Sequence, residues 1–183
     1  MLKTHSEKND LPFNGTIIDF ETIGNFCDDY CNEDSRRYKN ITLTMFGYID
    51  GDNLNILCAE GVESLKELKI KTIQILPTLK RPLFAFNSCF EKGVLFHSCG
   101  VTTEFDGELN AYRREWKGNA CAELDISNYN DPFDNDGGKC KLAWLRGDYE
   151  NAIQHNRSCL LKERDILLKR GCRKPDILNL CSD

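Results

Sequence analysis

Two carboxylates near the start of the chain have a spacing that suits a metal site. Asp19 and Glu21 lie two residues apart in the apolar segment Ile17–Gly24, so in a β-strand both side chains leave the same face of the sheet. Acids that share a face repel each other. A bound Mg²⁺ or Mn²⁺ relieves that repulsion and activates water for attack on a phosphodiester. This spacing also fits an edge strand whose two acids simply face solvent.

The segment that carries the pair is expected to be the first strand of an α/β domain. Gly15–Phe20 predicts a strand, and Ile41–Ile49 with Asn53–Ala59 predicts a hairpin that turns at Asp50-Gly51. Between the first two strands, Cys27–Lys39 is rich in Asp, Asn and Arg and is expected to be a solvated loop. The fold therefore opens with three strands.

Alternating helices and strands are expected next. A helix is predicted over residues 62–79, where a Ser64–Glu67 capping-box pattern opens a run with helical apolar spacing. Leu83–Phe86 predicts a short strand, and Ser88 begins a second helix that ends near Gly100. The alternation up to this point is β-β-β-α-β-α.

The second half of the chain carries weaker patterns until its last helix. A helix is expected near Glu108–Trp116, a short strand around Cys121–Ile126, and then an Asp- and Asn-rich loop to Gly138. Asp148 is a suitable cap for a final helix, and Gly171 is a suitable stop signal. The order of elements predicts an α/β fold.

Length and composition set limits on organisation. The 183 residues fit one domain, which is expected to span 1–183 with residues 1–13 frayed. A net charge of −5 argues against a protein that coats nucleic acid through a large positive field, although cations bound to carboxylates restore local positive charge. Apolar runs fall short of the roughly 18 residues of a transmembrane helix, and the polar opening segment lacks a secretory signal. We therefore expect a cytoplasmic protein without a membrane partner.

The ten cysteines are scattered without a paired CxxC framework. Free buried thiols are the expectation. The alternative is a zinc or iron–sulfur site built from Cys27, Cys31 and distant partners, for which one C-x3-C pair supplies half of a tetrahedral set.

Two segments resemble motifs of the DEDD-type 3′–5′ exonucleases. Ile17–Gly24 (IIDFETIG) resembles the first motif, an apolar strand that delivers Asp and Glu and is followed by Thr and Gly. Ala85–Leu95 (AFNSCFEKGVL) resembles the second, an Asn followed by an aromatic-acid pair at a helix start. Glu91 stands there where family members usually carry Asp. Because Glu91 is also placed to complete a capping box with Ser88, it is either a metal ligand or a cap.

The final helix resembles that of the predicted RNase H-like exonucleases, whose motif is His-Asn-x-x-Asp. His155 and Asn156 match, and Cys159 occupies the position of the last aspartate. Hard Mg²⁺ prefers oxygen to thiolate. The site is therefore either weakened or completed by Glu163, one helical turn further on. His155 is expected to act as general base or to position the attacking water, the alternative being a structural histidine on a semi-buried helix face.

The resemblance implies an RNase H-like fold with a mixed central sheet flanked by helices. It implies a two-metal 3′–5′ exonuclease that hydrolyses phosphodiester bonds of DNA or RNA with Mg²⁺ or Mn²⁺. The catalytic residues would be Asp19, Glu21 and His155. The metal ligands would be Asp19, Glu21, Glu91 and Glu163. The nucleic-acid-binding residues would be Asn87, Asn156, Arg157 and Arg164.

A different function remains open on the same residues. The chain would then be a catalytically weakened RNase H-like module that binds nucleic acid or a protein partner. Its basic C-terminal region, which includes Arg157 and Arg164, would contact phosphate. Lys and Arg at helical spacing also form ordinary solvated faces.

Overall fold

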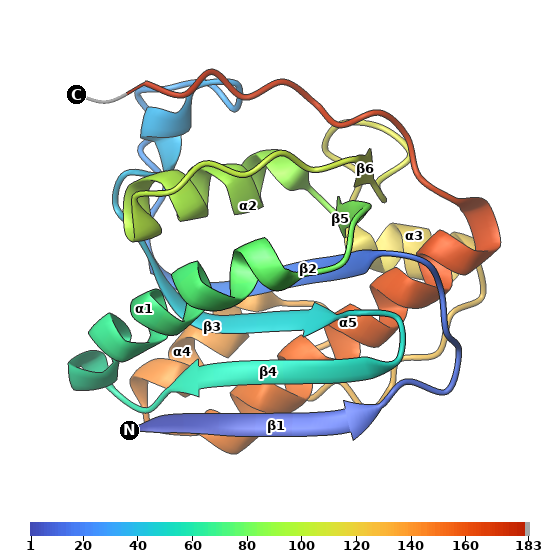
Figure 1. Cartoon of the computed structure of the whole chain (residues 1–183), viewed down its shortest axis with the longest axis horizontal. Coiled ribbons are helices and arrows are strands. Elements are labelled where there is room, and N and C mark those ends of the chain that lie inside the picture. Colours follow the sequence, from blue (N-terminus) through green and yellow to red (C-terminus); the bar gives the residue numbers. More distant parts are fainter. Residues whose placement is uncertain (182–183) are drawn as a thin grey trace.

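The computed structural model describes residues 1–181, which form an α/β structure around one mixed sheet (Figure 1). The strand order is β1-β4-β3-β2-β5-β6. Strands β1 to β4 pair antiparallel, whereas β5 runs parallel to β2 and β6 runs parallel to β5. The strands are β1 (Leu2–Lys8), β2 (Thr16–Gly24), β3 (Ile41–Ile49), β4 (Asn53–Ala59), β5 (Leu83–Ala85) and β6 (Gly107–Glu108).

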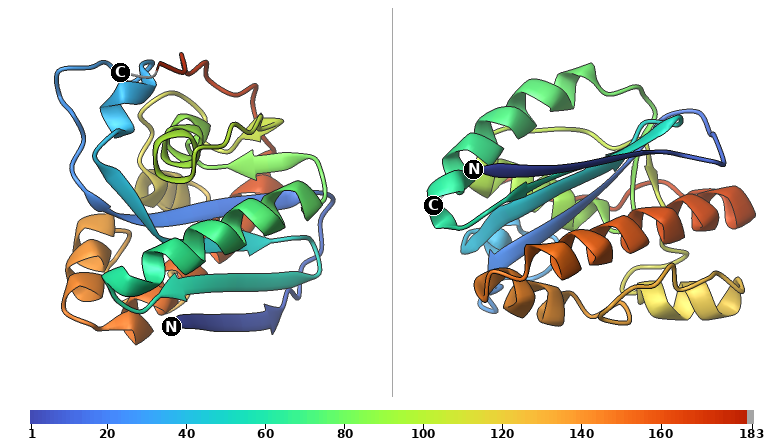
Figure 2. Two further views of the ribbon diagram at one scale, coloured as in Figure 1. Left: turned by 60° about the vertical axis from the view of Figure 1, so that its left-hand side comes forward. Right: turned by 90° about the horizontal axis from the view of Figure 1, so that it is seen from below.

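Helices cover both faces of the sheet. Helices α1 and α2 lie on one face, and α5 crosses the other in contact with α3 and α4 (Figures 1 and 2). The helices are α1 (Leu65–Ile75), α2 (Ser88–Val94), α3 (Lys117–Glu123), α4 (Gly137–Leu145) and α5 (Tyr149–Arg170). In the part of the chain that the structure describes, none of them combines the length and apolarity needed to cross a membrane.

Burial on both faces explains why the central strands read as continuous apolar runs. Ile17 and Ile18 of β2 are both fully buried although they point to opposite faces, and Met45 and Phe46 of β3 repeat the pattern. Asp19 follows directly in β2 with 7% of its surface exposed. The strand thus carries a carboxylate into the middle of the molecule.

Several expected elements are confirmed. The hairpin strands β3 and β4 have the predicted bounds, α1 lies inside 62–79, and β5 lies inside Leu83–Phe86. The last helix begins after Asp148, whose carboxylate accepts a hydrogen bond from the backbone N–H of Asn151. These elements carry their own periodicity and caps, so local sequence is enough to specify them.

The N-terminal prediction was wrong. Residues 1–13 were expected to be frayed, but Leu2–Lys8 pairs along its whole length with β4, from Leu2 opposite Ala59 to Lys8 opposite Asn53. The polar side chains of this segment show no pattern that predicts a strand. Its backbone groups nevertheless form hydrogen bonds with β4, the edge of the hairpin. The expected loop Cys27–Lys39 likewise contains a 3₁₀ turn at Ser35–Tyr38, whose Tyr38 is buried.

The predictions for the middle of the chain were also wrong. The helix expected at Glu108–Trp116 is replaced by β6 and a loop, and the strand expected at Cys121–Ile126 overlaps α3. The side chain of Glu108 is buried and accepts hydrogen bonds from the backbone N–H groups of Ser88 and Asp176. These long-range bonds outweigh local propensity. Helix α4 follows the expected loop and was not predicted.

Candidate metal centre

Strand β2 directs both predicted carboxylates toward α5. The side-chain amide of Asn156 donates to Asp19 Oδ2 over 2.7 Å, and His155 Nε2 lies 3.6 Å from Glu21 Oε1. The pairing of β2 with β3 shifts register between Glu21 and Thr22, an irregularity of the kind that re-aims side chains near functional sites. Asp19 and Glu21 therefore share one face, as their spacing predicts.

A glycine opposite Asp19 makes room for α5. Gly47 of β3 is the register partner of Asp19. A Cβ atom at Gly47 would collide with Asn156 Oδ1 and Leu160 Cδ1. Asn156 is itself fully buried, so the absence of a side chain at Gly47 lets this amide reach Asp19 and fix the orientation of its carboxylate.

The ammonium group of Lys117 lies inside the carboxylate cluster. Its Nζ donates to Asp19 Oδ1 over 2.9 Å and is 2.6 Å from Glu163 Oε1. Burial acts to lower the pKa of Lys117, but the charges of Asp19, Cys159 and Glu163 outweigh it and raise that pKa well above its ordinary value. Lys117 opens α3, between the helix and the strand that were expected there, and no sequence motif pointed to it.

Glu91 and Glu163 complete the cluster from α2 and α5. Burial raises the pKa of Glu91 well above its ordinary value, and the charges of Asp19 and Glu163 raise it further. The capping alternative for Glu91 is wrong, because the backbone N–H of Ser88 donates to Glu108 instead. Within residues 1–181, Glu91 Oε2 is buried without a hydrogen-bond partner. Carboxylates from β2 and α5 thus pair with one cation, and Glu91 adds a third buried carboxylate from α2.

A second group of donors lies beside the first. One ligand atom each from Glu21, His155 and Cys159 lies within 4.8 Å of the other two. Burial raises the pKa of Glu21 to about 7. Burial acts to lower the pKa of His155, but Cys159, Glu21 and Asp131 raise it to about 11. This group combines oxygen, nitrogen and sulfur, whereas the cluster around Lys117 offers oxygen from Asp19, Glu91 and Glu163.

Asp131 fixes the orientation of His155 and was not predicted. Its Oδ1 lies 2.7 Å from His155 Nδ1, and its Oδ2 accepts a hydrogen bond of 2.7 Å from Lys162 Nζ. Burial acts to raise the pKa of Asp131, but these two partners lower it overall. With Nδ1 engaged, Nε2 of the imidazole faces Glu21 and Cys159. Asp131 comes from an Asp-rich loop whose sequence gave no sign of its partner.

The second donor group lines a pocket of about 440 Å³, together with Asp19 and Lys117 of the first. Its walls include the rings of Phe26 and Phe90. The same two rings also line a smaller neighbouring pocket of about 150 Å³, together with Asn87, Arg37, Arg113 and Arg114. The arrangement places an acidic and a basic recess on the two sides of an aromatic pair.

The residues predicted to bind nucleic acid do not lie together. Asn87 is exposed and lines the basic recess. Asn156 is buried against Asp19. Arg164 is 5% exposed, and its guanidinium donates hydrogen bonds to Asn9 and Tyr129. Neither side chain can therefore contact a nucleic acid strand. Arg157 is half-buried and pairs with Glu7 at 2.9 Å.

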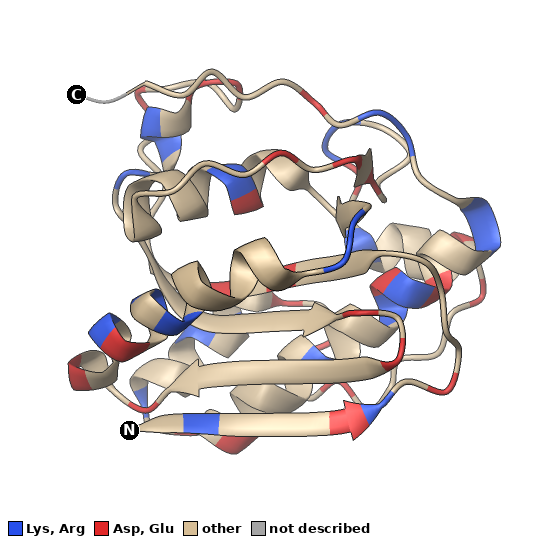
Figure 3. Ribbon diagram, in the orientation of Figure 1, with Lys and Arg blue, Asp and Glu red and all other residues tan. Residues whose placement is uncertain are grey.

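The basic C-terminal surface does not form as expected. Lysines and arginines alternate with acids along α5 and the segment after it (Figure 3). Arg170 pairs with Glu115, and Arg173 pairs with Asp176 at 2.9 Å. Because α5 is packed between the sheet and α3 and α4, many of its charged side chains are used inside the molecule.

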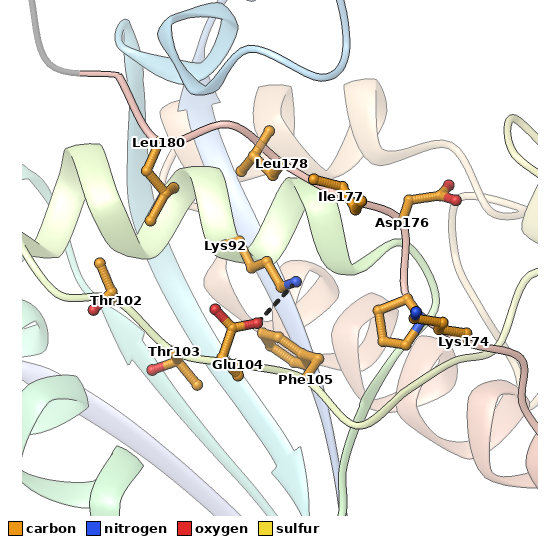
Figure 4. A pocket seen from close by; sticks show the side chains of 11 residues that line it. Lys92, Thr102, Thr103, Glu104, Phe105, Lys174, Asp176, Ile177, Leu178 and Leu180 are labelled. Carbon is orange, nitrogen blue, oxygen red and sulfur yellow. Dashed lines mark ion pairs between the residues drawn. The ribbon is translucent and has the colours of Figure 1, made fainter.

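Another pocket, of about 260 Å³, lies away from the carboxylates between α2 and the C-terminal segment (Figure 4). Its Lys92 pairs with Glu104 at 3.4 Å, and the Glu104 side chain is 80% exposed. An exposed pair of this kind contributes little energy. Lys174 and Asp176 also line this recess. Its Lys92 has a solvated partner, whereas the carboxylates that pair with Lys117 are buried.

Comparison with protein-family models, curated proteins and solved structures gives no match to the chain. The function therefore has to be argued from the site itself.

Proposed function

We propose that the chain is a metal-dependent phosphodiester hydrolase of the RNase H-like type, a 3′–5′ exonuclease that acts on DNA or RNA with Mg²⁺ or Mn²⁺. The mixed sheet and the β-β-β-α-β-α order from β2 to α2 are compatible with that fold. The observation that carries the proposal is the cation at the centre of the cluster. Lys117 Nζ stands between Asp19 and Glu163, in a position that suits a positively charged ion.

The donor types suit a hard divalent cation, although the oxygens of Asp19, Glu91 and Glu163 would have to draw together around it, since they do not all lie within 4.8 Å of one another. Asp19, Glu21, Glu91 and Glu163 offer carboxylate oxygens, which Mg²⁺ and Mn²⁺ prefer. Burial disfavours negative charge on Glu91 and Glu163, so a cation that joined them would remove a cost already present in the fold. A bound divalent ion supplies an activated water and neutralises charge on the phosphodiester.

The protein side chains have separate tasks in such a reaction. Asn156 orients Asp19, and Asp131 orients His155. With Nδ1 engaged by Asp131, Nε2 of His155 faces Glu21 and Cys159 at the wall of the pocket. It is therefore suited to position the attacking water, one of the two roles expected from the sequence.

The walls of the pocket suit a nucleic acid strand. Phe26 is 46% exposed and stands between the acidic and basic recesses. A base stacked on an aromatic ring gains about 1–3 kcal/mol without sequence preference. Phosphate on one side of that base would meet Arg114 and Asn87, while the phosphodiester on the other side would meet the carboxylates.

One observation favours the second candidate, a weakened module that binds a strand without cutting it. Lys117 already neutralises Asp19 and Glu163, and Cys159 stands where the family resemblance places an aspartate. Such a module would bind single strands through the aromatic pair and leave them intact.

The test compares Asp19→Asn and Glu21→Gln with the unmodified protein on end-labelled single-stranded DNA and RNA, with Mg²⁺ or Mn²⁺. Glu123→Gln, an exposed carboxylate at the end of α3, serves as the matched control. We expect cleavage by the parent and the control, and loss of cleavage in both site variants with the fold retained by circular dichroism. Equal cleavage by all four proteins would contradict the proposal. Binding without cleavage by the parent would favour the second candidate.

A further inference from the structure

We propose that Glu21, His155 and Cys159 bind a metal ion of the zinc class, Zn²⁺ or Co²⁺, at a position distinct from the oxygen cluster around Lys117. The inference rests on the proposed function, because it assigns the metal class of one part of the same site. It is carried by the donor types and their distances.

The three donor atoms are spaced like ligands of one small ion. His155 Nε2 lies 3.8 Å from Cys159 Sγ and 3.6 Å from Glu21 Oε1. Tetrahedral Zn²⁺ with bonds of about 2.0 Å to nitrogen and oxygen and about 2.3 Å to sulfur separates neighbouring ligand atoms by about 3.3–3.5 Å. The third pair, Glu21 and Cys159, lies within 4.8 Å, so shifts of up to about 1 Å would close the set.

The histidine is already held in the orientation that a metal ligand needs. Asp131 engages Nδ1 at 2.7 Å and is itself held by Lys162 at 2.7 Å. A carboxylate on the far nitrogen of a coordinating histidine fixes its tautomer and strengthens its basicity, and it is a usual companion of zinc ligands. His155 is 2% exposed and Cys159 is 4% exposed, so the donors are fixed by packing.

The remaining coordination position faces the pocket. Glu21, His155 and Cys159 all line the recess of about 440 Å³. Catalytic zinc sites have three protein ligands and one open position, whereas structural zinc sites have four protein ligands. Thiolate and imidazole select ions of this class over Mg²⁺, which explains how a cysteine can stand at this point of the helix in a metal enzyme.

The experiment titrates Co²⁺ into the metal-free protein and records its absorption spectrum. We expect one equivalent to bind with a thiolate-to-cobalt charge-transfer band, and Zn²⁺ to displace it. The band should be lost in Cys159→Ser and in Cys159→Asp. It should persist in Cys58→Ser, a buried thiol of β4, and in the Cys27→Ser/Cys31→Ser double variant. Asp131→Asn should keep the band and weaken Co²⁺ binding about 10–100-fold, the usual effect of removing such a support.

A band that is missing from the parent, or that persists in Cys159→Ser, would overturn the inference. If Cys159→Ser does not fold, loss of the band in Cys58→Ser or in the Cys27/Cys31 variant would place the thiolate elsewhere and overturn it equally. Cleavage with Mg²⁺ by a parent without the band would leave the proposed function standing and remove this inference. A parent protein that shows the band but cleaves with no metal ion would support this inference and contradict the proposed function.

Discussion

Replacing Lys117 by methionine tests whether the carboxylate cluster is a cation site. Methionine keeps most of the side-chain length and removes the charge. Asp19 and Glu163 would then lose the ammonium group that lies 2.9 Å and 2.6 Å from their oxygens. Negative charge would stay uncompensated in a buried place. We expect the metal-free variant to be less stable than the parent and to gain more from a divalent ion.

The size of the effect follows from the burial of the partners. Removing one member of a buried ion pair costs about 3–5 kcal/mol. The Lys117 side chain keeps 16% of its surface exposed, and Glu163 keeps none, so we expect the lower end, about 3 kcal/mol. In a chain of this length 1 kcal/mol shifts Tm by about 2–4 °C, which gives a loss of about 6–12 °C. Mn²⁺ at about 100 times its Kd would restore about 2.7 kcal/mol.

The assay is thermal melting with chelator and with increasing Mn²⁺, on the parent, on Lys117→Met and on Lys92→Met. Lys92 has one exposed partner, so the control should lose less than about 1 kcal/mol. The reasoning is refuted if Mn²⁺ raises the Tm of Lys117→Met no more than that of the parent. The ammonium would then not compete with a metal ion, and the carboxylates would form a structural ion-pair network.

Three further predictions concern the groups around this cluster. Burial raises the pKa of Glu21 from 4.5 to about 7, so stability of the metal-free protein should fall as pH rises through that window. Glu21→Gln should flatten this slope in urea titrations, and an unchanged slope would contradict the assignment. Gly47→Ala should cost about 1–3 kcal/mol and weaken Mn²⁺ binding, because it displaces Asn156; a variant with parental urea midpoint and Mn²⁺ affinity would show that α5 does not need this gap. Arg164→Ala should destabilise by about 2–4 kcal/mol through lost charged hydrogen bonds, whereas Arg157→Ala should cost less than about 1 kcal/mol; equal urea midpoints for the two would argue against the buried role of Arg164.

Local pattern explains which elements could be predicted from sequence. The hairpin β3–β4 and the helix α5 carry periodic apolar residues with a turn or a cap at their ends, and such signals act within a few residues. Strand β6 has two residues and exists because Phe84 and Ala85 of β5 pair with it. Nothing within the segment around Glu108 encodes those partners, so propensity alone gave a helix there.

The same division holds for the site. Asp19 and Glu21 could be predicted because their spacing fixes a shared face in any strand. Glu163 and His155 follow from the last helix once its register is known. Lys117 enters the cluster from a helix that sequence did not predict, so its role depends on tertiary packing that local patterns do not reveal.

Lys117 and Cys159 change the electrostatics of the site in the same direction. Burial raises the pKa of the Cys159 thiol, which disfavours negative charge there, and an ammonium between Asp19 and Glu163 adds a positive charge. Both reduce the need of the oxygen cluster for a hard divalent ion. Asp131 holds the His155 imidazole at 2.7 Å, and the other ring nitrogen faces a thiol and a carboxylate. Loss of all metal binding would leave this arrangement without a function. The arrangement is better explained by two cation positions, one at the oxygens where Lys117 competes with a hard ion and one with donors for a softer metal. Lys117→Met perturbs the first and Cys159→Ser the second, so their effects on Mn²⁺ and Co²⁺ binding should separate.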